Sequence, residues 1–119
     1  MNPQQLRYCT AKALADLARE AADKRIAREV PPPTQSMTDA ELQAHAIAAT
    51  RIDAECHVWV TCEAMVEAER DLIAWVREQV SVLPQYAAHQ ADMEKVFSTY
   101  WQFPAIREKL IRTCLQLRA

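Results

Sequence analysis

Cysteine and histidine side chains that could hold a metal ion gather in one short stretch of the sequence. Cys56, His57 and Cys62 lie close together, and His45 precedes them. A zinc site needs three or four nitrogen or sulfur ligands within about 2.3 Å of one point. On one helix only residues three or four apart share a face, and Cys56 and Cys62 are six apart. The spacing therefore favours buried free thiols, as expected for Cys9 and Cys114 as well, and predicts no metal.

Acidic side chains form a second group, Glu63, Glu67, Glu69 and Asp71. Carboxylates four residues apart share a helix face and could shift one another's pKa for acid–base chemistry. A di-iron site in a helical bundle would need Glu-x-x-His on two helices, and this spacing is absent from the sequence. Charged clusters on helices are usually solvated. We therefore predict no catalytic residue, no cofactor and no enzymatic activity.

The sequence contains no glycine at all. Glycine supplies the positive φ angles of tight turns and lets the backbone approach a ligand closely. Without it, phosphate-binding loops, dinucleotide fingerprints and nucleophile elbows are excluded. Glycine is also disfavoured inside helices, so its absence is typical of a chain that is mostly helical.

Prolines and capping residues give the boundaries of the predicted helices. Asn2 and Pro3 suit a helix start, with Gln5 as capping partner. Thr38 and Glu41 form a second capping box. The expected helices cover residues 3–30, 39–83, 85–101 and 104–118, with a proline linker at 31–37.

These helices predict a single all-α domain, residues 1–119, folded as a four-helix antiparallel bundle-like domain with one long central helix. The long helix carries an apolar seven-residue repeat, in which Trp59 is expected to lie in the core. A break within 39–83 stays open, because helices of this length are uncommon in small domains. The repeat members are Ile52, Trp59, Val66, Ile73 and Val80.

The first helix is amphipathic by its sequence. Leu6, Ala13, Leu14, Leu17 and Ala21 fall on one face. Charge is also uneven along the chain, because residues 38–83 carry nine acidic and three basic side chains, whereas both flanks carry a basic excess. These charges could pair within the bundle or between subunits.

Aromatic residues gather near the end of the third predicted helix, and tryptophan and tyrosine dominate binding hot spots. The predicted partner-binding residues are Trp75, Tyr100, Trp101, Phe103, Arg107 and Arg112. We expect a non-enzymatic helical protein that binds a larger protein complex or forms a homodimer. An example would be a small bacterial or phage accessory factor that inhibits a host defence complex.

The alternative function is a small nucleic-acid-binding transcriptional regulator that uses the last two helices. A net charge of −2 argues against it, because nucleic-acid-binding domains usually carry a basic surface. No segment of the sequence has the apolar length of a membrane span, and no small-molecule substrate is evident. The expected location is cytoplasmic.

Overall fold

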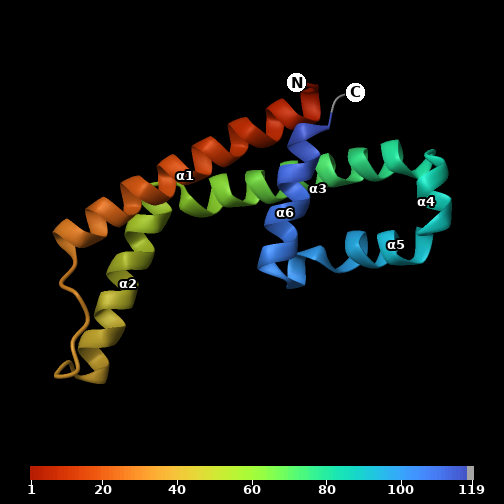
Figure 1. Ribbon diagram of the computed structural model, residues 1–119. Coiled ribbons are helices and arrows are strands. Elements are labelled where there is room, and N and C mark those ends of the chain that lie inside the picture. The colour runs from red at the N-terminus through yellow and green to blue at the C-terminus, as the bar shows by residue number, and fades with distance from the viewer. Residues whose placement is uncertain (118–119) are drawn as a thin grey trace. The chain divides into compact units, whose positions relative to one another are not determined.

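Six α-helices and one short 3₁₀ helix make up the part of the chain that the structure, a computed structural model, describes: residues 1–117 (Figure 1). Within these residues no strand occurs, which confirms the all-α prediction. The four-helix antiparallel bundle is not confirmed, because two of the expected helices are interrupted. Arg118, at the end of the expected last helix, lies outside the described residues. The elements are α1 (Pro3–Glu29), α2 (Asp39–Glu55), α3 (Val58–Ser81), α4 (Pro84–Ala88), α5 (Gln90–Thr99), η1 (Tyr100–Gln102) and α6 (Pro104–Gln116).

The starts of α1 and α2 follow the local sequence. The backbone N–H of Gln5 donates to Asn2 Oδ1 at 2.8 Å, and the N–H of Asn2 donates to Gln5 Oε1 at 3.0 Å. Thr38 and Glu41 form the equivalent capping box before α2. Each box satisfies helix-end N–H groups that have no intrahelical acceptor, which explains why these two boundaries were predictable.

The prediction of one uninterrupted helix over 39–83 is wrong, because the helix ends at Glu55 and a new helix begins at Val58. His57 lies between them with φ of 61°, in the left-handed region. This conformation costs a non-glycine residue about 1–2 kcal/mol. Packing of α2 on α1 offsets the cost: Ile52 joins Ala22 and Val30 in one buried apolar cluster.

The expected helix 85–101 is also interrupted, into α4, α5 and η1. His89 ends α4, and its N–H donates to the carbonyl of Tyr86 at 3.1 Å. Tyr86 is buried, and its hydroxyl donates to the Glu94 carboxylate. This contact between α4 and α5 depends on the turn at His89, so tertiary contacts outweigh helix propensity here.

The chain divides into two compact units, which we call unit 1 (residues 1–9 and 66–119) and unit 2 (residues 10–65). The expectation of a single domain over 1–119 stays a prediction. Within residues 1–117, no helix has the length and the apolar composition that a membrane span requires.

Unit 1 contains most of the buried residues. Its core takes Leu72 and Val76 from α3, Phe97 from α5, and Ile111 and Cys114 from α6. The side chain of Gln5 is also buried, and its amide donates to the carbonyls of Cys114 at 2.9 Å and Leu117 at 2.7 Å. The start of α1 therefore caps the end of α6 (Figure 1).

Unit 2 has a much smaller core. Among its residues only Ala22, Val30 and Ile52 are buried. Two ion pairs join α1 to α2: Arg19 to Asp53 at 2.7 Å and Arg25 to Glu55 at 2.9 Å. The basic N-terminal flank and the acidic middle of the chain therefore pair within one molecule.

Candidate protein-interaction surface

The apolar face of α1 within unit 2 is exposed. Leu14 and Leu17 keep 53% and 61% of their surface, and Ala13 and Ala21 beside them are exposed as well. We call these four residues the leucine face. The sequence placed them on one face correctly, but nothing in unit 2 covers that face. Leu6, which continues this face of α1 within unit 1, is also exposed.

A different face of α1 packs against the rest of unit 2. Ala22 is fully buried, and Ile26 packs against the same apolar cluster. Ala15 and Ala18 are half-buried. Ala22 and Ile26 lie roughly 140–180° around the helix from Leu17. The helix is therefore apolar on two sides. The side that packs inside unit 2 carries Ile26 and small alanines, whereas the leucines lie on the exposed side.

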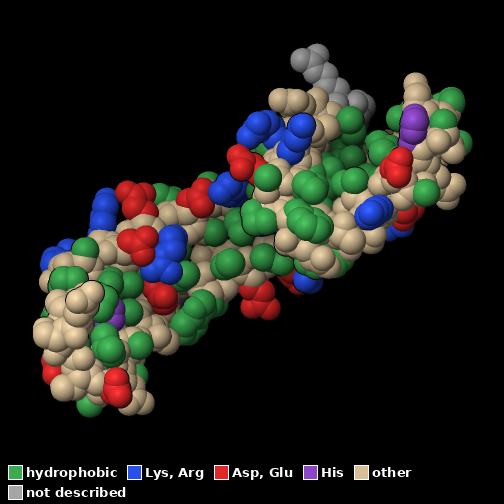
Figure 2. Space-filling view, turned by 60° about the horizontal axis from the view of Figure 1, so that its bottom comes forward, with side chains coloured by type: hydrophobic (Ala, Val, Ile, Leu, Met, Phe, Trp, Pro, Cys, Tyr) green, Lys and Arg blue, Asp and Glu red, His purple; other side chains and the backbone are tan. Residues whose placement is uncertain are grey.

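Further large apolar side chains of unit 2 are exposed. Leu42 and Ile47 on α2 keep 40% and 54% of their surface, and Trp59 and Val60 on the first turn of α3 keep 53% and 66%. The expected core position of Trp59 is therefore wrong, because the bend at His57 removes it from the apolar seam that a straight helix would have. Figure 2 shows hydrophobic side chains reaching the surface between charged ones on the face that it draws.

Two of the predicted partner-binding aromatics in unit 1 are exposed. Trp101 keeps 58% and Phe103 keeps 50% of its surface, at the turn from η1 into α6. Ile106, on the first turn of α6, is exposed beside them in sequence. Trp101 makes an edge-on contact with Tyr100 at 5.5 Å between ring centroids.

Tyr100 and Arg107 instead make contacts inside unit 1. Tyr100 is buried, and this burial raises the pKa of its hydroxyl. Arg107 lies 2.6 Å from Oε1 of the buried Glu69. This ion pair with Glu69 raises the pKa of Arg107. Arg112 is exposed and pairs with Glu108 one turn earlier, at 2.9 Å.

Trp75 is half-buried and lines an open groove of unit 1 with a volume of about 410 Å³. An ion pair between Arg7 and Asp71 crosses this groove. Its remaining lining residues are Pro3, Gln4, Ala74 and Glu78. Neither Trp101 nor Phe103 lines this groove.

The candidate catalytic and metal-binding residues do not converge. Within residues 1–117, no group of three or more histidine, cysteine, aspartate or glutamate side chains is placed to hold a metal ion. Of the acidic cluster, Glu69 pairs with Arg107 and Asp71 pairs with Arg7, whereas Glu63 and Glu67 are exposed. The four cysteines are free thiols: Cys114 is buried as expected, Cys9 and Cys56 are half-buried, and Cys62 is exposed against expectation.

Comparison with protein-family models, with curated proteins and with solved structures gives no match for this chain.

Sequence reasoning missed the leucine face as a binding surface. The row of Leu6, Ala13, Leu14, Leu17 and Ala21 was interpreted as the single apolar face of α1. The signal that could have found it is a second apolar row on the same helix, Tyr8, Ala15, Ala22 and Ile26. A helix with two apolar rows predicts a packing partner for each.

Proposed function

We propose that this protein is a non-enzymatic binding protein whose leucine face is covered by another polypeptide chain. Leu14 and Leu17 support the proposal most directly, because they lie one turn apart on the same helix face and both remain more than half exposed. Contiguous exposed apolar surface of this kind marks protein-interaction sites.

Burial of the leucine face would contribute a binding free energy large enough to change affinity measurably. Full burial of one leucine side chain contributes about 1.5–3 kcal/mol. Covering the exposed halves of Leu14 and Leu17 would therefore contribute about 2 kcal/mol together. That is more than a tenfold difference in affinity, since 1.4 kcal/mol corresponds to a factor of about ten.

The small core of unit 2 supports the same proposal. With three buried residues it leaves most of its apolar side chains in water. A bound chain would bury further apolar surface of unit 2. Binding would therefore raise the free energy of unfolding of this unit.

The test compares Leu17→Lys with Ala27→Lys, which introduces the same side chain at an exposed α1 position roughly 80° around the helix. The wild type and Ala27→Lys should form a complex, either a dimer detected by light scattering or a specific partner retained from the native host. Leu17→Lys should lose that complex while its helical circular dichroism stays unchanged, and its melting should match that of the uncomplexed wild-type protein.

Two results would contradict the proposal. One is a complex that both lysine variants retain equally. The other is a wild-type protein that stays monomeric at high concentration and retains no protein from its host.

A further inference from the structure

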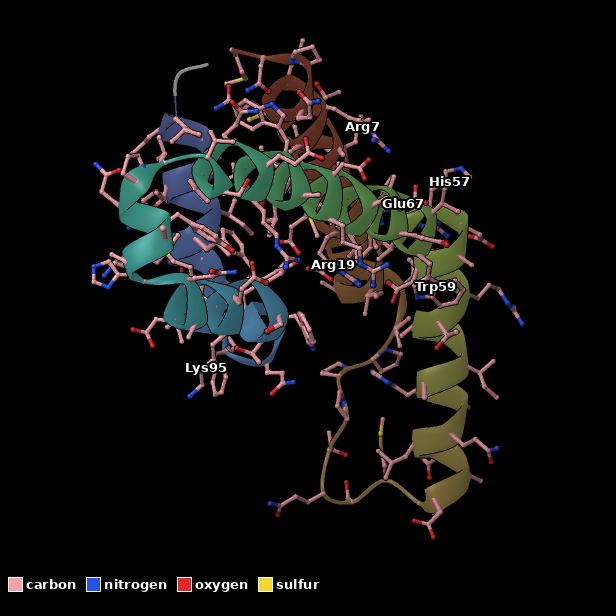
Figure 3. The ribbon with its side chains drawn as sticks, turned by 90° about the vertical axis from the view of Figure 1, so that its right-hand side faces the viewer. Arg7, Arg19, His57, Trp59, Glu67 and Lys95 are labelled. Carbon is pink, nitrogen blue, oxygen red and sulfur yellow. The ribbon has the colours of Figure 1, made fainter. Side chains whose placement is uncertain are left out.

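The junction between α2 and α3 depends on the backbone of one residue. Cys56 closes α2 with its N–H on the carbonyl of Ile52 at 2.9 Å, and the N–H of His57 donates to Ala54 at 3.1 Å. Thr61 is the first residue of α3 to donate back, to the carbonyl of His57 at 3.1 Å. Cys56 keeps a negative φ of −87°, so the φ of 61° at His57 is the left-handed angle that separates the two helical segments. Figure 3 labels His57 at this junction.

The sequence around this junction favours a continuous helix. No proline and no glycine lies between residues 39 and 83, and the apolar seven-residue repeat runs through the break from Ile52 to Trp59 and Val66. In a continuous helix the N–H groups of Val58, Trp59 and Val60 would donate to the carbonyls of Ala54, Glu55 and Cys56. The bend places these three N–H groups in the first turn of α3, ahead of any intrahelical acceptor.

Contacts between α1 and α2 hold the bent form. Arg19 pairs with Asp53, and Arg25 pairs with Glu55. Arg25 also lies 4.0 Å from Cys56 Sγ, at the junction itself. Ile52 is the one buried residue of α2, and it lies in the cluster with Ala22 and Val30. We call these contacts the latch.

We propose that the α2–α3 junction is a hinge, and that α2 leaves the latch to extend α3 into one continuous helix over residues 39–81. In this straight form His57 takes a right-handed helical φ, three backbone hydrogen bonds form, and Ala22, Val30 and Ile52 become accessible. Release requires the loss of two partly exposed ion pairs and of one small apolar cluster. Three residues of that cluster are buried, and Ile26, Ala48, Cys56 and Val58 pack against them partly exposed. This inference does not rest on the proposed function.

Backbone substitution at the hinge tests the proposal. Glycine accepts φ of 61° without cost, whereas alanine resists it and favours helix. Carbon-13 shifts of residue 57 report its φ region, and amide hydrogen exchange of Val58, Trp59 and Val60 reports their hydrogen bonds. His57→Gly should keep the bend. His57→Ala should give helical shifts at residue 57 and slow exchange at the three amides by about threefold, because alanine has a higher helix propensity than histidine.

A second pair of variants tests the latch. Arg19→Ala combined with Arg25→Ala should also slow exchange at Val58–Val60 and move the His57 shifts toward helical values. Lys24→Ala should leave them unchanged, because Lys24 pairs only with Glu20 on its own helix. Amides of Leu72 and Val76, in the core of unit 1, serve as the reference for an intact fold.

The proposal is overturned if His57→Ala retains left-handed shifts at residue 57. It is equally overturned if the three amides exchange as fast as in the wild type while α2 loses its own protection, because α2 then unfolds instead of extending α3.

Discussion

Glu69 is the one charged side chain among residues 1–117 that is buried, at 4% exposure. A buried carboxylate is costly unless a counter-ion accompanies it. Arg107 supplies this counter-ion from α6, so a residue that sequence reasoning assigned to partner binding instead joins α6 to α3. The sequence could not reveal this pairing, because Glu69 and Arg107 lie far apart in the chain on two different helices.

Removal of Arg107 should therefore destabilise unit 1. Arg107→Met leaves the Glu69 carboxylate buried without a counter-ion, and the free energy of unfolding in urea should fall by about 3 kcal/mol. The double variant Glu69→Gln with Arg107→Met should recover most of the loss, because it removes the buried charge. Equal unfolding midpoints for the wild type and Arg107→Met would contradict this assignment.

The cysteine thiols should differ sharply in reactivity. Burial raises the pKa of the Cys114 thiol from its ordinary 9.0 to about 11, so this thiol stays protonated in the folded protein at pH 8. Cys62 is exposed. With an aromatic disulfide reagent at pH 8, Cys62 should react at once and Cys114 only after unfolding, because the thiolate is the nucleophile.

The same shift has a consequence for stability. Above pH 9 the unfolded chain ionises Cys114 while the folded chain does not, so this residue lowers stability as pH rises from about 9 to 11. Cys114→Ala should flatten this part of the stability profile. Equal reaction rates of all four thiols in the native protein would show that Cys114 is not protected.

At the scale of elements, α1 and α6 are joined at their ends by one side chain. The Gln5 amide donates to carbonyls in the last turn of α6, which otherwise have no intrahelical donor. Gln5→Leu should lower the free energy of unfolding by about 1–3 kcal/mol, the cost of unsatisfied buried polar groups. Gln116 is an exposed glutamine on α6, so Gln116→Leu is the matched control. In chemical denaturation this variant should change the free energy of unfolding little. Equal losses in the two variants would show that the Gln5 contact contributes nothing specific.

Helix starts that are set by residues next to them in the sequence could be predicted. The capping boxes at Asn2 and Thr38, and the proline at the start of α6, act within one helical turn. The break at His57 could not be predicted, because histidine carries no turn signal and the left-handed φ is stabilised by contacts with α1. The exposure of Trp59 follows from that break, so the same missing information caused both errors.

The candidate site was predictable only in part. Trp101 and Phe103 are exposed, as a partner-binding surface requires. The sequence indicated these two residues because aromatic side chains gather at the end of a predicted helix. The leucine face was visible only as a pattern. Which of two apolar rows on α1 faces inward depends on the close packing of Ala22 against Val30 and Ile52.

At the scale of the whole molecule, burial is unequal between the two units. Twelve of the described residues of unit 1 are buried, against three in unit 2. Local stability follows the number of buried apolar contacts, so unit 2 is the part of the chain that gains most from a bound partner. This contrast is the reason for assigning the binding role to the leucine face of α1.

The most direct test of that role is photo-crosslinking inside the cells that naturally produce the protein. The photoreactive residue p-benzoylphenylalanine replaces Leu17 in one variant and Ala27 in another. If the leucine face is covered by another chain, light should join the protein covalently to a second polypeptide from position 17 and not from position 27. Absence of any adduct at position 17, or equal adducts at both positions, would contradict the account.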